Sequence, residues 1–365
     1  MTEYTQSQTA KKPLAFFMAF RAENAFLAGN CALALNKMLT SDCYDIVLMP
    51  VGDLSDADRG ALLKIGRTVI EPFTSAIDGL SDDVLLFAEA KLRALTLLDR
   101  YETVVRLATG TAVQRDLMPA VNRLINPSLD SASDRPAIAL LLRDAPLADF
   151  VADTETAEES DLRAPAPDPT MVVLTDRLPF KAMSAAAEGL LRENGASFTL
   201  PVSAVLGLLV KQFGLQFEVL DGKEYGVFCG EPEAATAGLV RFGINRNPWQ
   251  KSACRKAFPE WHRTHLDWEL LGGTNGIVSD LDEEADRPEE PEAFNVGPDE
   301  KLLMNKRWRC RWSDVTVWKT NKQHMYRITF GGKKPFLTLE SSLTSDKVDE
   351  DAKAKRKALQ KADAE

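Results

Sequence analysis

Two short strings of paired carboxylates are the first residues in this sequence that could hold a metal ion. They are Asp56 with Asp58 and Asp280 with Asp282, and carboxylate oxygens are the ligands that Mg²⁺ and Ca²⁺ prefer. The first pair follows Ser55, a pattern typical of the start of a helix, where acidic side chains also favour the helix dipole. The second pair lies in a strongly acidic stretch of the kind that is usually solvated. We therefore interpret neither pair as a metal site.

Histidines and cysteines are the other side chains that ordinarily bind metals, and the chain has three and five of them. His262 and His265 would share one face of a helix, as two ligands do, but they lie beside Trp261 and Trp268, and a packed amphipathic helix is the better interpretation. The cysteines are far apart and form no Cys-x-x-Cys pair, which is typical of reduced thiols in a cytoplasm. We expect no metal cofactor and no redox motif.

Net charge and apolar patterning exclude further classes of protein. The chain has 365 residues and a formal net charge of -10, which argues against broad nucleic-acid binding. No run of about 18 apolar residues is present, so we expect no transmembrane segment. The short apolar stretch from Leu14 to Phe20 meets Arg21 and Glu23, which is unlike a secretory signal. We expect a cytoplasmic protein.

Apolar runs alternate with amphipathic segments in the first third of the chain. Continuous apolar runs predict strands buried on both faces, and apolar residues at helical spacing predict the helices between them. The expected strands are 14–20, 44–49, 68–70 and 103–107, and the expected helices are 24–39, 55–66 and 87–98. This alternation predicts an α/β domain in which the four strands are neighbours in a largely parallel sheet.

The middle of the chain gives weaker signals. Residues 149–169 are acidic and then rich in proline and alanine, which predicts a surface loop or linker. A short strand is expected at 171–174, helices are expected at 183–192 and 204–213, and 249–270 is expected to be helical with breaks.

The composition changes abruptly after residue 275. Residues 280–300 hold ten acidic side chains and one arginine, whereas residues 301–334 hold ten basic side chains and one aspartate. Alternation in the basic stretch predicts a β-hairpin unit. The expected organisation is a disordered N-terminus (1–12), an α/β domain (13–275), an acidic linker (276–300), a basic aromatic-rich β unit (301–345) and a charged tail (346–365).

The basic stretch carries Trp308, Trp312 and Trp318, and it has two interpretations. Stacking and positive charge could bind a glycan or protein partner, an anionic lipid surface or nucleic acid. Alternatively, the aromatic side chains pack on the main domain and the acidic stretch neutralises the charges. We favour the second interpretation because the two stretches nearly cancel in charge.

Four segments resemble motifs of glycosyltransferase family 8, the glycogenin and galactinol-synthase type. Residues 22–29 resemble the segment after that family's first strand, and 46–55 resemble its second strand and turn. Residues 91–117 resemble its central segment, where a strand ends in Leu-Asp-x-Asp-Thr, and 239–249 resemble its His-Phe-x-Gly-x-x-Lys-Pro-Trp box. The resemblance extends over about residues 13 to 250. It implies a GT-A-like nucleotide-diphospho-sugar transferase fold, here with a small C-terminal β-rich addition.

The residues with which the family holds a metal are replaced in this sequence. In the family, two aspartates and a histidine hold the metal against the diphosphate, and the metal neutralises the charge that develops as the sugar–phosphate bond breaks. Their positions correspond to Ala108, Gly110 and Arg241, and that of the base-stacking tyrosine corresponds to Phe26. Neither Ala108 nor Gly110 has a side-chain oxygen that a hard cation could use.

Arg241 therefore has two interpretations. A guanidinium group can bind phosphate with two hydrogen bonds, so Arg241 could replace the metal, with Arg246 and Arg106 as helpers. Alternatively, Arg241 belongs to an ordinary surface ion pair.

We expect a diverged glycosyltransferase-like protein that binds a nucleotide sugar, with UDP as the preferred carrier, and that transfers the glycosyl group without the usual metal. Such sheets bind ligands at the carboxyl ends of their strands. The expected nucleotide-binding residues are Ala22, Phe26, Ala108, Thr109, Gly110, Arg241 and Arg246. The alternative is a catalytically inactive protein of the same fold with a structural or partner-binding role.

Divalent metal should have little influence on nucleotide binding, because Ala108 and Gly110, at the positions that would ligate it, have no side-chain oxygen atoms. Titration calorimetry of UDP binding with Mn²⁺ and with a chelator should give affinities within about tenfold of each other, or about 1.4 kcal/mol. A strict Mn²⁺ requirement would show that the metal-binding motif lies elsewhere in the chain.

Overall fold

The computed structural model describes residues 10–125, 136–151, 163–243 and 246–277, together with the backbone of three strands between 315 and 339. The chain divides into two compact units, residues 1–248 with 253–276 and residues 249–252 with 277–365. Most of the expected N-terminus, the acidic linker from 278 and the charged tail lie outside the described residues. In the part of the chain that is described, no helix is both long and apolar enough to cross a membrane.

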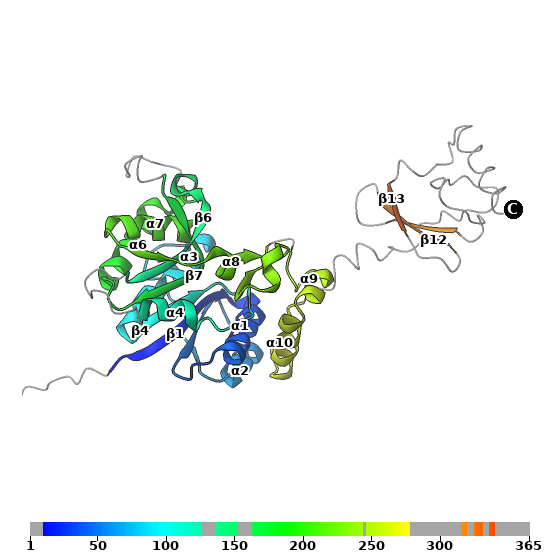
Figure 1. Ribbon diagram of the computed structural model, residues 1–365, viewed down its shortest axis with the longest axis horizontal. Helices are drawn as coiled ribbons and strands as arrows, with labels where there is room; N and C mark the ends of the chain where they lie inside the picture. The colour runs from blue at the N-terminus through cyan, green and yellow to red at the C-terminus, as the bar shows by residue number, and fades with distance from the viewer. Residues whose placement is uncertain are drawn as a thin grey trace, which may run out of the picture. The chain divides into compact units, whose positions relative to one another are not determined.

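A seven-stranded sheet in the order β3-β2-β1-β4-β7-β6-β8 forms the centre of the first unit (Figure 1). Its parallel half consists of β1 (Lys12–Arg21), β2 (Asp45–Val51), β3 (Thr68–Ile70) and β4 (Tyr101–Leu107). Most residues of β1, β2 and β4 are buried, as expected for strands with helices on both faces. The prediction that these four strands are neighbours in one sheet is confirmed.

The other half of the sheet is antiparallel at its junction with β4. β7 (Pro165–Thr175) runs antiparallel to β4 and to β6 (Ile138–Pro146), and β8 (Phe217–Val219) runs parallel to β6. The predicted strand at 171–174 is therefore confirmed as the second half of β7. The predicted loop is wrong for its last residues, because β7 begins at Pro165. Before Met171, β7 pairs with β6 alone and with shifts in register, and proline is tolerated at such edges and bulges.

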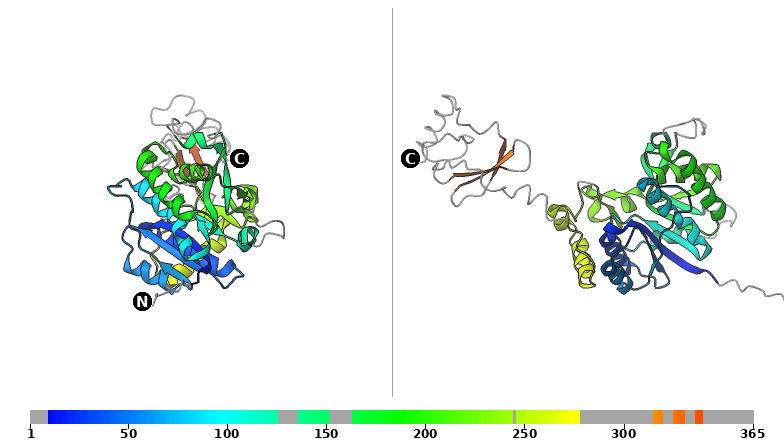
Figure 2. Two further views of the ribbon diagram at one scale, coloured as in Figure 1. Left: turned by 90° about the vertical axis from the view of Figure 1, so that its left-hand side faces the viewer. Right: turned by 180° about the vertical axis from the view of Figure 1, so that it is seen from behind.

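Helices cover both faces of the sheet (Figure 2). On one face, Ala15, Phe17 and Val104 join the apolar core that α3, α6 and α7 complete, while α1 and α2 follow β1 and β2 on the other face. The helices of this unit are α1 (Ala25–Met38), α2 (Asp56–Lys64), α3 (Asp83–Leu92), α4 (Met118–Ile125), α6 (Phe180–Asn194), α7 (Pro201–Gln212), α8 (Gly222–Tyr225), α9 (Ser252–Ala257) and α10 (Pro259–Leu270). Short 3₁₀ helices are η1 (Ala22–Asn24), η2 (Arg93–Asp99), η3 (Leu147–Phe150), η4 (Gly195–Ser197) and η5 (Pro232–Ala235).

Ser55 caps α2 as its position in the sequence predicts. The Asp58 backbone N–H donates to Ser55 Oγ at 3.1 Å, and Ser55 Oγ donates to the Asp58 carboxylate at 2.7 Å. That carboxylate also accepts from the backbone N–H and the hydroxyl of Thr274, at 2.8 and 2.7 Å. Asp58 is thus a helix-start residue that holds the segment after α10, in agreement with the structural interpretation of this acidic pair.

Two smaller sheets complete the described structure. β5 (Thr111–Val113), β10 (Leu239–Arg241) and β9 (Val227–Phe228) form one sheet beside the central sheet, with β10 in the middle. In the second unit, β11 (Val315–Lys319), β12 (Met325–Phe330) and β13 (Phe336–Leu339) form an antiparallel sheet, which contains the predicted hairpin. Trp318 lies in β11, whereas Trp308 and Trp312 lie outside the described residues.

α9 and α10 confirm the prediction of a helical segment with a break, and α10 packs closely against α1. Trp268 of α10 is fully buried, and its indole N–H donates to the Thr274 carbonyl at 2.9 Å. It lies against Gly29 of α1 so tightly that a Cβ atom at Gly29 would be 2.2 Å from the ring. His265 is buried and stacks on Trp261 at 5.4 Å between ring centroids, so the packed-helix interpretation holds for this histidine.

Replacing Gly29 with alanine should destabilise the first unit by about 1–3 kcal/mol, because the added methyl group overlaps the indole of Trp268. Gly60→Ala is the matched control, since Gly60 also lies within a helix but has nothing within 4 Å of its added Cβ. This control should be neutral or stabilising by up to about 1 kcal/mol. Chemical denaturation measures both changes, and equal stabilities of the two variants would contradict the proposed fit of Trp268 against Gly29.

Candidate functional site

The carboxyl ends of β1 and β4 form the place in this sheet where a ligand is expected. The chain continues from β1 into α1 on one face, whereas the helices of the β4 half lie on the other face, and open α/β sheets bind ligands at such a switch point. Ala22 follows β1, and Ala108, Thr109 and Gly110 follow β4. Four of the expected nucleotide-binding residues therefore follow the carboxyl ends of these two strands.

Arg241 reaches the same edge through the small sheet. It pairs with Thr111 of β5, and the next residue, Phe242, donates its backbone N–H to the Gly110 carbonyl at 3.0 Å. The exposed Arg246 lies beside Gly230 instead, where an added Cβ would be 2.8 Å from its Nη1 atom. The structure thus brings Arg241 together with residues 108–110, and nucleotide binding by these residues stays a prediction.

A buried aspartate that the sequence analysis did not identify lies at the centre of this edge. Asp168 belongs to β7, and its neighbour Thr170 accepts the backbone N–H of Ala108 at 2.9 Å. The Asp168 carboxylate accepts from the Thr170 N–H at 2.9 Å and from its hydroxyl at 2.6 Å. Burial raises the pKa of Asp168, but these hydrogen bonds and the charges of Arg241 and Arg143 outweigh burial and lower it. Asp168 is therefore an ionised carboxylate with firm hydrogen bonds.

Asp168 ion-pairs with two arginines. Arg241 Nη1 donates to its carboxylate, and Arg143 Nη2 lies 3.6 Å from the same oxygen. The Arg241 guanidinium also stacks over Phe228, with 3.8 Å between the guanidinium carbon and the ring centroid. Arg241 thus forms an ion pair in this structure, as one of its two interpretations expected. The pair differs from an ordinary surface ion pair because its carboxylate is buried. Whether Arg241 also binds phosphate stays a prediction.

Three further cations extend the positive charge toward β1. Arg106 of β4 is 4% exposed and interacts electrostatically with Asp168. Lys91 of α3 lies 3.9 Å from the ring centroid of Phe87. Burial lowers the pKa of Lys91 to about 7, and the charges of Arg106 and Arg21 add to this effect. We call the five side chains of Arg21, Lys91, Arg106, Arg143 and Arg241 the cationic cluster.

Several donors of the cationic cluster are buried without an acceptor. Nε and Nη1 of Arg106, Nε of Arg143 and Nε of Arg241 find no hydrogen-bond partner among the described residues. A buried guanidinium group that lacks acceptors is costly, and phosphate oxygens are the acceptors that fit its planar fork best. The arrangement can therefore bind an anion of high charge density.

The same residues do not fit a divalent cation. The side chains of Ala108 and Gly110 carry no oxygen, their carbonyl oxygens already accept hydrogen bonds from Thr111 and Phe242, and the Asp168 carboxylate is already neutralised by Arg241 and Arg143. Across the part of the chain that the structure describes, no three His, Cys, Asp or Glu side chains are grouped as metal ligands would be. The chemistry at this edge is that of guanidinium and ammonium groups.

Phe26, the expected base-stacking residue, is covered by the chain itself. Its ring is 4% exposed and packs edge-on against His265 at 5.9 Å. The segment after α10 lies on it so closely that a Cβ at Gly276 would be 2.0 Å from the ring. Stacking of a base on Phe26 stays a prediction, and it requires the segment around Gly276 to move.

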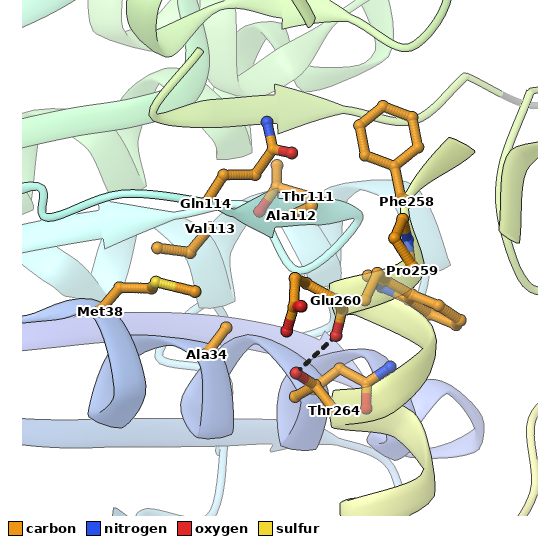
Figure 3. Close-up of a pocket in the computed structure, with 12 residues that line it drawn as sticks. Ala34, Met38, Thr111, Ala112, Val113, Gln114, Phe258, Pro259, Glu260 and Thr264 are labelled. Carbon is orange, nitrogen blue, oxygen red and sulfur yellow. Dashed lines mark hydrogen bonds between the residues drawn. The ribbon is translucent and has the colours of Figure 1, made fainter. Parts of the chain in front are cut away.

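A separate cavity of about 200 Å³ lies between α1, β5 and the start of α10 (Figure 3). Ala34 and Met38 of α1 line one side of the cavity, and Phe258 and Glu260 line another. Residues of β5 line the remaining side. Asn30, which also lines the cavity, is 2% exposed, and its side-chain oxygen has no hydrogen-bond partner among the described residues. We call this cavity the α1–α10 pocket, and it has room for a small polar molecule.

Comparison with known proteins gives structural matches only. No protein-family model and no curated protein sequence matches the chain. Among solved structures, the apo structure of the WbbM bifunctional glycosyltransferase matches 73% of this chain at 10% identity, with a TM-score of 0.54. The match spans 53% of the WbbM chain, about half its length.

Two other glycosyltransferase structures match more loosely. Galactosyltransferase LgtC, in complex with donor and acceptor sugar analogues, matches 73% of this chain and 97% of its own at 12% identity and a TM-score of 0.45. The glycosyltransferase GlyE of Streptococcus pneumoniae TIGR4 matches 72% of this chain and 63% of its own at 12% identity and a TM-score of 0.47.

The match to WbbM, with a TM-score of 0.54, establishes the fold. The predicted α/β class with a GT-A-like glycosyltransferase fold is confirmed. Assignment to family 8, and with it the replacement of the Asp-x-Asp pair, stays a prediction.

Neutralising the Asp168 carboxylate should destabilise the protein. Asp168→Asn keeps the shape but leaves Arg241 and Arg143 without their counter-charge, a loss of about 3 kcal/mol. Because the folded-state pKa is lowered, the carboxylate stabilises the fold above its unfolded pKa of about 3.9, and this contribution is lost as the pH falls through the folded value. The difference between wild type and variant should therefore shrink below about pH 4.

Asp176→Asn is the control for this experiment. Asp176 pairs with Lys11 at 3.0 Å, but both side chains are about one-third exposed, so the loss should stay below about 1 kcal/mol. Urea denaturation between pH 3 and 7 measures both effects. Equal losses in the two variants would contradict a structural role for the buried carboxylate.

Proposed function

We propose that this chain binds a nucleotide sugar, UDP-linked by preference, at the carboxyl ends of β1 and β4, and that its cationic cluster replaces the metal ion. The observation that carries the proposal is the set of buried guanidinium donors on Arg106 and Arg241 that lack acceptors. A diphosphate offers several oxygens and two negative charges, which match these donors in geometry and in sign.

The proposed reaction is transfer of the glycosyl group to an acceptor hydroxyl. The acceptor oxygen forms a bond to the anomeric carbon while the bond from that carbon to the diphosphate oxygen breaks, and the acceptor proton passes to a base. Negative charge grows on the leaving diphosphate. Fixed positive groups that face this charge lower the barrier without needing to reorganise. The residues that would contact the acceptor are not identified.

Arg241 and Lys91 have different roles in this proposal. Asp168 and Phe228 hold the Arg241 guanidinium by its Nη1 atom and by its face, which leaves Nε for a phosphate oxygen. Lys91 has a pKa near 7, so an approaching diphosphate would raise that pKa and draw a proton onto the amine. The positive charge would then increase as the ligand arrives.

A second candidate function is supported by the position of Phe26. Its ring is covered by His265 and by the segment around Gly276, which supports a catalytically inactive protein that keeps the fold for a structural or partner-binding role. Binding of UDP-sugars to the full chain separates the two candidates. Absence of binding by any nucleotide sugar would favour the inactive protein.

Arg241→Ala should weaken UDP-sugar binding by about ten- to a hundredfold, because a charged hydrogen bond to phosphate contributes about 1.5–3 kcal/mol. The loss should decrease at high ionic strength, because the Arg241 side chain is 17% exposed and a partly exposed charge is screened by salt. Calorimetry at low and high salt measures both effects. Melting temperatures of the variants show whether they remain folded.

Arg100→Ala is the matched control. Arg100 precedes β4, at the opposite end of that strand, where it pairs with Glu71 at 2.6 Å and is about half exposed. Its removal should leave the affinity unchanged. Equal affinities of wild type and Arg241→Ala would exclude Arg241 as the replacement for the metal.

A further inference from the structure

Two cysteines that are distant in the sequence have their sulfur atoms in contact. Cys229 Sγ lies 3.8 Å from Cys254 Sγ, although the residues are 25 positions apart. Cys229 directly follows β9 and is 6% exposed, whereas Cys254 lies in α9 and is partly exposed. Both belong to the first compact unit. Two thiols at this distance need only a small movement to bond.

We propose that Cys229 and Cys254 are a redox modification site, which forms a reversible intramolecular disulfide when the protein meets a hydroperoxide. The inference does not depend on nucleotide binding, since neither sulfur belongs to the cationic cluster.

The hydroperoxide is the oxidant of this reaction and accepts the two electrons that the two thiols lose. With hydrogen peroxide, the Cys254 thiolate attacks one oxygen, an S–O bond forms, the O–O bond breaks, and hydroxide leaves and is protonated to water. The Cys229 sulfur then attacks the resulting sulfenic sulfur, the S–S bond forms, the S–O bond breaks, and the departing hydroxide takes the Cys229 proton and leaves as water. Two thiols are oxidised, and one hydroperoxide is reduced.

The contact between the two sulfurs and the accessibility of Cys254 favour this pair over the other described cysteines. Burial and Cys254 raise the pKa of Cys229 to about 11, with Arg246 opposing the shift, so Cys229 is the thiol that reacts second. Cys254 is the more accessible sulfur and so is the one that an oxidant would reach first. Cys31 is fully buried, and burial raises its pKa to about 12, which makes it inert. Cys43 is exposed and provides a comparison for unspecific oxidation.

The disulfide would connect two elements that border the sites described above. The Cys229 N–H donates to the Arg241 carbonyl at 2.8 Å, and the Cys254 carbonyl accepts from the N–H of Phe258, which lines the α1–α10 pocket. The ring of Phe258 also packs edge-on against Phe242 at 5.4 Å. A bond between the two sulfurs therefore fixes α9 to the strand pair that holds Arg241, and it limits the movement of the pocket wall.

Oxidation of the full chain with hydrogen peroxide tests the proposal. The fully reduced protein has five thiols, and the count should fall to three, with a peptide linking Cys229 to Cys254 in the digest. Closing this loop should raise the melting temperature by about 5–10 °C, and dithiothreitol should reverse the shift.

Two variants complete the test. Cys43→Ser should lose two thiols and gain the same linked peptide as wild type, whereas Cys254→Ser should form no such peptide and show no rise in melting temperature. Wild-type protein that gives over-oxidised or unlinked Cys254, with no linked peptide, would overturn the proposal. If Cys254→Ser does not fold, the presence or absence of the linked peptide in oxidised wild-type protein decides the test.

Discussion

One buried carboxylate balances the positive charge at the carboxyl end of the sheet. Asp168 faces Arg241 and Arg143 directly and Arg106 at longer range. Removing one partner from a buried pair leaves the other group without compensation, which costs several kcal/mol. The carboxylate is also held by Thr170, whose backbone carbonyl anchors Ala108. The course of the chain after β4 and the orientation of Arg241 therefore depend on the same few atoms.

This dependence distinguishes the edge of the sheet from a site built for a metal ion. A metal ion would need several carboxylates at this edge, and each would repel the others until the metal arrived. A guanidinium group carries its charge permanently and needs only one carboxylate to hold it in position. A metal ion can change its ligands as a substrate binds, whereas the guanidinium groups at this edge provide positive charge at fixed positions. Such fixed charge suits an anion whose position varies little.

The sequence predicts the parallel half of the sheet well because its signals are local. β1, β2, β3 and β4 each contain a short apolar run, and helical patterns separate these runs, so that short windows suffice to recognise them. β6 has a local signal, the apolar run at 138–142, which the prediction did not use. The first half of β7 is missed because prolines obscure the strand pattern and its pairing partner lies elsewhere in the chain. Asp168 is missed for the same reason, since its partner Arg241 is 73 residues away. The contact between Cys229 and Cys254 likewise has no local signal.

The close fit of α10 against α1 has a consequence for synthesis of the protein. Asn30 near the start of the chain contacts His265, 235 residues later, and Trp268 lies against Gly29. A ribosome makes about 5–20 residues per second, so the nascent α1 waits for at least about ten seconds before its last partner emerges. During that time the surface of α1 around Gly29, which Trp268 covers in the folded protein, has no partner from α10.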